Sequence, residues 1–146
     1  MKVLFLYPNK YLSPGINTGI SILSAVLKQE NNEVSLFDYT FVKTKESYKK
    51  LSKSMAVFLP TEHSLESLVA DDPVESLEES FERRLEQFPP DLIALSAMTG
   101  TFDMGINLLK KFKSKLKCKV IVGGVHATIA TEDALTPDIV DFICVG

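Results

Sequence analysis

Small and hydroxyl-bearing residues follow two predicted strands of this chain, at places where a ligand could approach the backbone. Gly123 and Gly124 come directly after an apolar run, and Ser96 comes after an earlier one. Glycine lacks a Cβ, so the backbone at such a pair can lie against a ligand. In open α/β sheets, ligands bind at the carboxyl ends of the strands. These residues predict a binding site made of backbone and hydroxyl groups, without the paired carboxylates of an acid–base catalyst.

Continuous apolar runs predict the strands that position these residues. Such runs, rather than alternating ones, are typical of parallel strands that are covered on both faces. The predicted strands are residues 3–7, 34–37, 92–95, 120–122 and 142–145. Apolar residues at helical spacing lie between them. The helices that this spacing predicts are residues 18–29, 72–88, 102–116 and 131–135.

The alternation of strands and helices predicts an α/β fold. We expect a doubly wound, flavodoxin-like (Rossmann-like) five-stranded parallel sheet, order 2-1-3-4-5, with helices on both faces. The connection 41–90 is long and is predicted to be helical within the same domain. One of its helices would begin at Asp72-Pro73, because proline is favoured at the first helical position. Another would lie near residues 48–55, and His63 is expected at the surface.

The composition argues against several classes of function. A net charge of −3 is unlike that of general nucleic-acid-binding proteins, which need a basic face. No apolar run is long enough to cross a bilayer. Cys118 and Cys144 are far apart, so we expect no zinc or iron–sulfur site within the chain and predict no metal ligand. Unpaired cysteines are typical of a reducing setting, which predicts a cytoplasmic protein.

The residues that follow the strands do not match several common ligand sites of this fold. A phosphoacceptor receiver domain needs acidic residues after the first strand and an aspartate at the end of the third, where this chain has Asn9 and Ser96. A dinucleotide site needs Gly-x-Gly-x-x-Gly after the first strand, which residues 8–15 do not supply. A P-loop is also absent, and the first loop is too poor in Ser and Thr for a flavodoxin. A large, weakly charged ligand, bound by backbone and hydroxyl groups, remains.

Several pieces of sequence match one family pattern in their order and spacing. They are KVLFLYP (2–8), the helix 19–27 followed by Glu33-Val34, Asp38, PDLIALS (90–96), VGGVHAT (122–128) and DFICVG (141–146). Together they resemble the N-terminal cobalamin-binding domain of B12-dependent radical S-adenosylmethionine (SAM) enzymes. That group includes methyltransferases and the anaerobic magnesium-protoporphyrin IX monomethyl ester cyclase. The resemblance covers essentially the whole chain.

The resemblance implies that residues 1–146 are a cobalamin-binding domain and a fragment of a longer chain. The domain would hold base-off B12 for a downstream radical SAM catalytic domain of the same polypeptide. That domain would contain the 4Fe-4S cluster and SAM and would perform methyl transfer or cyclase-type radical chemistry. This chain has no Cys-x-x-x-Cys-x-x-Cys motif. We therefore expect the fragment alone to be inactive, with no catalytic residue.

The resemblance also implies a set of residues that bind the nucleotide tail of cobalamin. Ser96, Met98 and Thr99 would line the pocket for this tail. Gly123 and Gly124 would pack against it.

Two further implications concern the cobalt. Many cobalamin domains have Asp-x-His-x-x-Gly after the first strand, and this chain has no histidine before His63. The resemblance therefore implies cobalamin without a histidine ligand, with residues Asn9, Lys10, Tyr11 and Leu12 facing the lower side of the corrin. His126 is predicted to hydrogen bond to the tail or to shape a turn, rather than to ligate cobalt.

Two other functions stay open at this point. The chain could be a flavodoxin-like module that binds another ligand or a protein partner, without cobalamin. It could also be a self-contained enzyme that uses Ser96 or His126, although no partner for a catalytic triad stands at a suitable spacing.

Overall fold

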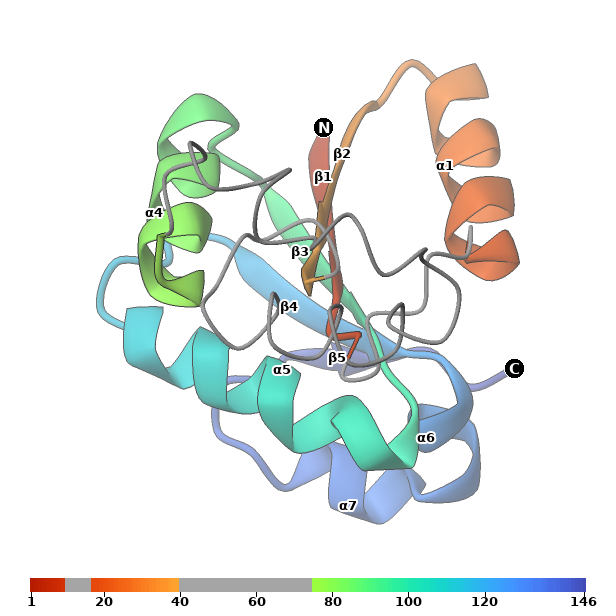
Figure 1. Cartoon of the computed structure of the whole chain (residues 1–146). Coiled ribbons are helices and arrows are strands. Elements are labelled where there is room, and N and C mark those ends of the chain that lie inside the picture. The colour runs from red at the N-terminus through yellow and green to blue at the C-terminus, as the bar shows by residue number, and fades with distance from the viewer. Residues whose placement is uncertain (10–16, 40–74) are drawn as a thin grey trace, which may run out of the picture.

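A computed structural model describes residues 1–9, 17–39 and 75–146 of the chain. Strands and helices alternate along these ranges (Figure 1). In chain order they are β1 (Lys2–Tyr7), α1 (Thr18–Gln29), β2 (Glu33–Asp38), α4 (Leu77–Gln87), β3 (Leu92–Ser96), α5 (Thr99–Phe112), β4 (Lys119–Gly123), α6 (Val125–Ile129), α7 (Thr131–Leu135) and β5 (Phe142–Ile143). Within these described ranges, no helix is both long enough and apolar enough to cross a membrane.

The five strands form one parallel sheet with the order β2-β1-β3-β4-β5. Leu6 of β1 pairs with Leu95 of β3, which pairs in turn with Val122 of β4. Because in-register residues of neighbouring strands share a face, these three side chains point to the same side of the sheet. The predicted α/β, flavodoxin-like sheet and its strand order are confirmed.

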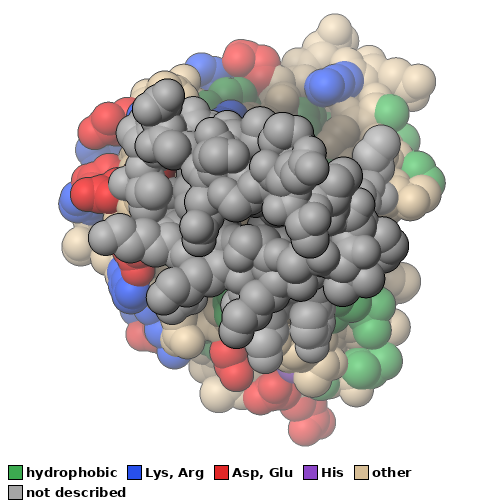
Figure 2. Space-filling view, in the orientation of Figure 1, with side chains coloured by type: hydrophobic (Ala, Val, Ile, Leu, Met, Phe, Trp, Pro, Cys, Tyr) green, Lys and Arg blue, Asp and Glu red, His purple; other side chains and the backbone are tan. Residues whose placement is uncertain are grey.

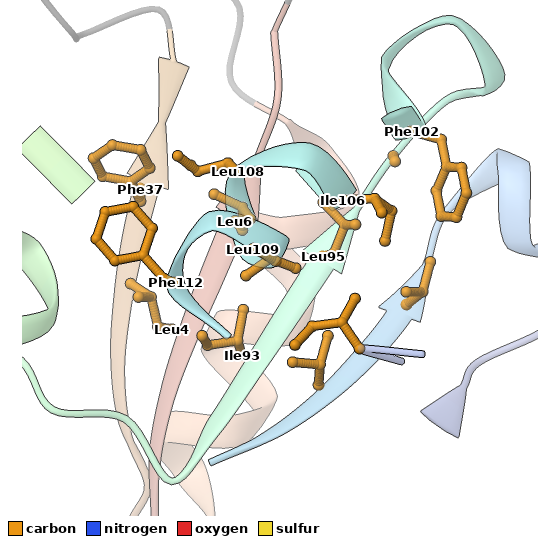
Figure 3. Close-up of a cluster of buried hydrophobic side chains, with 14 of the residues drawn as sticks. Leu4, Leu6, Phe37, Ile93, Leu95, Phe102, Ile106, Leu108, Leu109 and Phe112 are labelled. Atoms are coloured by element: carbon orange, nitrogen blue, oxygen red, sulfur yellow. The ribbon is translucent and has the colours of Figure 1, made fainter. Parts of the chain in front are cut away.

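Helices cover both faces of the sheet, as predicted, but they cover them unequally. α4, α5, α6 and α7 pack on one face, around a core that includes Ile93, Leu95 and Leu109 (Figure 3). The other face has a smaller buried cluster of Val3, Phe5 and the α1 residue Ile20. Figure 1 shows α1 on one side of the sheet and α4, α5 and α7 on the other.

α4 begins later than proline at position 73 predicts. Its first helical residue is Leu77, and Ser76 is the N-cap. The hydroxyl of Ser76 accepts a hydrogen bond from the backbone N–H of Glu79, and the Glu79 carboxylate accepts one from the N–H of Ser76. This capping box satisfies two N–H groups that a helix start leaves without partners. Positions 72–74, the predicted helix near 48–55 and His63 lie outside the described residues.

The predicted bounds of α1 and α7 are confirmed, and those of β1 to β4 lie within one residue of the structure, whereas α5, the segment after β4, and β5 differ more. α5 covers Thr99–Phe112 rather than 102–116, because the Thr101 hydroxyl accepts a hydrogen bond from the N–H of Met98 and so caps an earlier start. Residues Val125–Ile129, expected to be a loop, form α6. β5 ends at Ile143 rather than at 145.

Ion pairs join the exposed sides of α4 and the end of α5. Lys111 pairs with Glu78, and Lys115 pairs with Glu82. The hydrogen bond from Lys111 lowers the pKa of the Glu78 carboxyl below its ordinary value. The lysines at the end of α5 therefore complement the acidic face of α4 as well as the helix dipole.

Replacement of a core leucine of α5 tests this packing. Leu109 is fully buried, so Leu109→Ala is expected to lower the free energy of unfolding by about 3–4 kcal/mol, through lost burial and a cavity. Leu23→Ala in α1 is the matched control, because Leu23 is 53% exposed. It should change the free energy of unfolding by less than about 1 kcal/mol. Urea denaturation followed by circular dichroism measures both. Equal losses would contradict the assignment of the main core to the α5 side.

Candidate ligand-binding site at the carboxyl edge of the sheet

The sheet face that carries α1 is partly uncovered near the carboxyl ends of β3, β4 and β5. Along β3 and β4, Leu95 and Val122 face the α5 side and are almost fully buried. The residues that alternate with them face the α1 side and are only half-buried. We define the open strip as the half-buried Ala94, Ser96, Ile121 and Gly123 together with the exposed Phe142 of β5; Ala94, at its inner end, also packs against the cluster beside α1. Among the residues that the structure describes, α1 is the only helix packed on this face.

The open strip is continuous across three strands. Ser96 is in register with Gly123, Ala94 with Ile121, and Ile121 with Phe142. Alanine, serine and glycine leave room above the sheet, and the Ser96 hydroxyl adds a hydrogen-bonding group. Phe142 is 52% exposed and presents an apolar ring at one end of the strip. The strip can therefore take an apolar, flat group together with a polar one.

The two glycines of the predicted pair have different functions. A Cβ on Gly123 would meet nothing closer than Cys144 Cβ at 3.7 Å, so there is space beside it. Gly124 has a φ of +90°, and a Cβ there would lie 2.8 Å from Ala97 O and 3.0 Å from Ala97 N. Gly123 lies on the open strip, whereas Gly124 allows the loops after β3 and β4 to touch.

Backbone hydrogen bonds join these two loops at Ala97. Ala97 N–H donates to the carbonyl of Gly123 at 3.1 Å, and Ala97 O accepts from the N–H of His126 at 3.1 Å. The loop after β3 leads directly into α5, and the loop after β4 leads into α6. The link therefore fixes the start of both helices relative to each other.

Met98 and Thr99 lie at this edge, where α5 begins. Both are exposed, and Met98 precedes the first helical residue, Thr99. The first N–H groups of a helix have no partner within it, so they are available to a ligand. Apolar side chains of α6 stand beside them: Val125 is 56% exposed and Ile129 is 69% exposed. In Figure 2, hydrophobic side chains gather on the side of the molecule where α6 lies.

His126 lies beneath this surface rather than on it. Its side chain is 2% exposed, and its ring stacks on Phe102 with the ring centroids 4.0 Å apart. Nδ1 lies 3.4 Å from the Thr99 hydroxyl. Nε2 has no hydrogen-bond partner among the described residues, although Asp133 Oδ2 is 3.3 Å away outside hydrogen-bond geometry. Both nitrogens are thus directed into the protein.

The first-loop residues are only partly described. Asn9 follows β1 at the same carboxyl edge and is buried. Lys10, Tyr11 and Leu12 lie outside the described residues. In the part of the chain that is described, no group of three His, Cys, Asp or Glu side chains could hold a metal ion. A cavity of about 300 Å³ lies between β2 and α4, and none of the predicted site residues lines it.

The site residues predicted from the sequence and the candidate site in the structure overlap, but the prediction did not include the apolar residues of the edge. The described residues of the prediction, Asn9, Ser96, Met98, Thr99, Gly123, Gly124 and His126, all lie at or just below the carboxyl edge. The open-strip residues Ala94, Ile121 and Phe142 were missed, as were Val125 and Ile129. One feature of the sequence could have indicated the open strip: the small residues Ala94 and Ser96 alternate with bulky residues along one strand.

Replacement by alanine is expected to have opposite effects on stability at Gly124 and at Gly100. Gly124→Ala is expected to lower the free energy of unfolding by about 1–3 kcal/mol, because alanine is strained at positive φ and its Cβ would meet Ala97. Gly100→Ala is the matched control in the first turn of α5, with no atom within 4 Å of its Cβ. It should be neutral or stabilising by up to about 1 kcal/mol. Urea unfolding of both variants checks this, and equal stabilities would contradict the proposed role of Gly124.

Comparisons with known proteins agree with this geometry. A crystal structure described as a novel cobalamin-binding protein from Desulfitobacterium hafniense DCB-2 superposes on the chain with a TM-score of 0.54 at 13% sequence identity. The match covers 97% of this chain and 51% of that one, so the chain spans about half the length of its structural neighbour. No curated protein sequence matches the chain. The family model for the B12 binding domain matches residues 9–146. The chain therefore belongs to the family of B12-binding domains.

Proposed function

We propose that this domain binds cobalamin at the carboxyl edge of the sheet, with the nucleotide tail along the open strip. The observation that carries this proposal is the strip itself, a run of small and apolar residues across three strands at the ligand edge of an α/β sheet. Family membership supports the same ligand. The structural neighbour is also described as a cobalamin-binding protein.

The chemistry of the strip fits the nucleotide tail. The benzimidazole of the tail is flat and apolar, which suits Ala94, Ile121 and the exposed ring of Phe142. The ribose and phosphate need polar partners, and the Ser96 hydroxyl stands between the small residues. The space beside Gly123 lets the tail approach the backbone of β4. These side chains would hold the tail without a charged residue.

We also propose that the cobalamin is bound base-off and without a histidine ligand. A benzimidazole on the strip would not be free to ligate cobalt. The first loop contains no histidine. The nitrogens of His126 are buried and directed toward Thr99 and Asp133, which supports a role other than cobalt ligation. Asn9, Lys10, Tyr11 and Leu12 would then face the lower side of the corrin.

The module would serve a radical SAM catalytic domain further along the same polypeptide, as the sequence resemblance implies. When bound, cobalamin supplies the chemistry of methyl transfer or of cyclase-type radical reactions; the residues of this chain bind and orient it. The unpaired Cys118 and Cys144 support a cytoplasmic setting. The coding sequence beyond position 146 tests this proposal, because a three-cysteine cluster motif is expected there.

Titration of the chain with hydroxocobalamin tests the proposed ligand. We expect saturable binding accompanied by the absorption change of the base-off form. Gly123→Val would fill the space beside the strip and is expected to weaken binding at least about tenfold by steric overlap. Ser114→Val, in the turn that follows the far end of α5, is the control and should bind like the wild type.

Two outcomes would contradict the proposal. No spectral change at high micromolar cobalamin would favour the alternative, a flavodoxin-like module for another ligand or a protein partner. Equal affinities of the Gly123 and Ser114 variants would place the tail somewhere other than the open strip. Thermal unfolding of both variants shows that each is folded.

A further inference from the structure

His126 is a buried polar side chain whose two nitrogens have very different surroundings. Its ring is stacked on Phe102 and held from α6 between α5 and α7. Nδ1 faces the Thr99 hydroxyl at 3.4 Å, and Nε2 faces Asp133 Oδ2 at 3.3 Å without a hydrogen bond. A buried polar atom without a partner costs free energy, so the arrangement needs an explanation.

The neighbour of Nε2 decides where the imidazole proton lies. A neutral imidazole has one N–H donor and one lone-pair acceptor. A carboxylate oxygen only accepts, so a lone pair on Nε2 would be repelled by Asp133, whereas an N–H there is attracted to it. Of the two neutral tautomers, the carboxylate therefore favours the one with the proton on Nε2 and with Nδ1 as the acceptor.

This tautomer fixes the direction of the Thr99 hydroxyl. A hydroxyl has one proton, and in this tautomer the Thr99 hydroxyl, 3.4 Å from Nδ1 of His126, donates it to that nitrogen. The Thr99 oxygen then presents only lone pairs to its other neighbours. Thr99 is exposed at the carboxyl edge, as the first residue of α5. A ligand group that contacts this oxygen must be a hydrogen-bond donor.

We propose that His126 is a positioning residue that holds the Thr99 hydroxyl as an acceptor, so that Thr99 recognises a donor group of cobalamin. The donor is a carboxamide N–H of the corrin or a hydroxyl of the ribose; phosphate oxygens are acceptors and would not fit. This inference rests on the proposed cobalamin site. The proposal gives Thr99 a different role from Ser96, the other hydroxyl at this edge, because His126 orients only the Thr99 hydroxyl.

The tautomer is measured directly on the full chain without cobalamin. Two-bond ¹H–¹⁵N correlation spectra show which ring nitrogen of a histidine is protonated. The sequence has two histidines, so His63→Gln assigns the signals of His126. We expect the spectra to show a proton on Nε2 of His126 and Nδ1 as the acceptor. A proton on Nδ1 would overturn the proposal, because Thr99 would then be free to donate to the ligand.

Cobalamin affinity tests the effect on recognition. Thr99→Val is expected to weaken binding about tenfold by removing the acceptor, whereas Thr99→Ser should retain binding within about twofold. His126→Phe keeps a ring on Phe102 but removes both nitrogens, and it should weaken binding severalfold. In the Thr99→Val background, His126→Phe should cause no further loss. An equal further loss would show a structural role only and would overturn the proposal.

A corrinoid without the nucleotide tail, cobinamide, identifies the donor. If Thr99→Val weakens cobinamide binding as it weakens cobalamin binding, the donor is a corrin carboxamide. If its effect disappears with cobinamide, the donor is the ribose hydroxyl. Failure of the wild type to bind any corrinoid would refute the proposed function and the recognition by Thr99 with it, while the spectra still decide the tautomer. Thermal unfolding checks that each variant is folded.

Discussion

The contact between the loops after β3 and β4 is the constraint on which the site depends. Ala97 exchanges backbone hydrogen bonds with Gly123 and His126, and the contact is close enough that residue 124 must lack a Cβ. Because these loops lead into α5 and α6, the same contact sets where Thr99 stands and where the His126 ring enters the core. The position of the edge groups is thus a consequence of backbone packing rather than of the side chains that a ligand would touch.

The two faces of the sheet differ in how completely they are packed. The face under α4, α5 and α7 contains the larger core, with Phe81, Leu109 and Val122 almost fully buried. The opposite face has a small buried cluster beside α1 and then the open strip. A strand such as β3 serves both, since its alternate residues point to opposite faces. Residues of the open strip can therefore vary on one face while the core on the other face stays intact.

Much of the fold could be predicted from sequence because parallel strands and amphipathic helices leave strong periodic signals. The apolar runs gave the strands and, with right-handed connections, their order. The start of α4 was mistaken because the Ser76–Glu79 capping box competes with the proline signal at position 73. The start of α5 was mistaken because Met98 and Thr101 form a cap that the apolar spacing does not reveal. The glycine pair and Ser96, predicted as site residues, lie at the carboxyl edge of the sheet; their contact with a ligand stays a prediction. The surroundings of His126 were not predicted, because they depend on how α6 packs against Phe102 of α5 and beside Asp133 of α7.

The contrast between Gly123 and Gly124 has a consequence for how this family diverges. Position 124 is constrained by the protein's own backbone, whereas position 123 is constrained by whatever occupies the space beside it. A descendant that loses its ligand while keeping its fold would be free to exchange the first glycine but not the second. In a set of homologous sequences, glycine at position 123 would then indicate the members that retain the ligand. Glycine at position 124 would indicate only that the fold is retained.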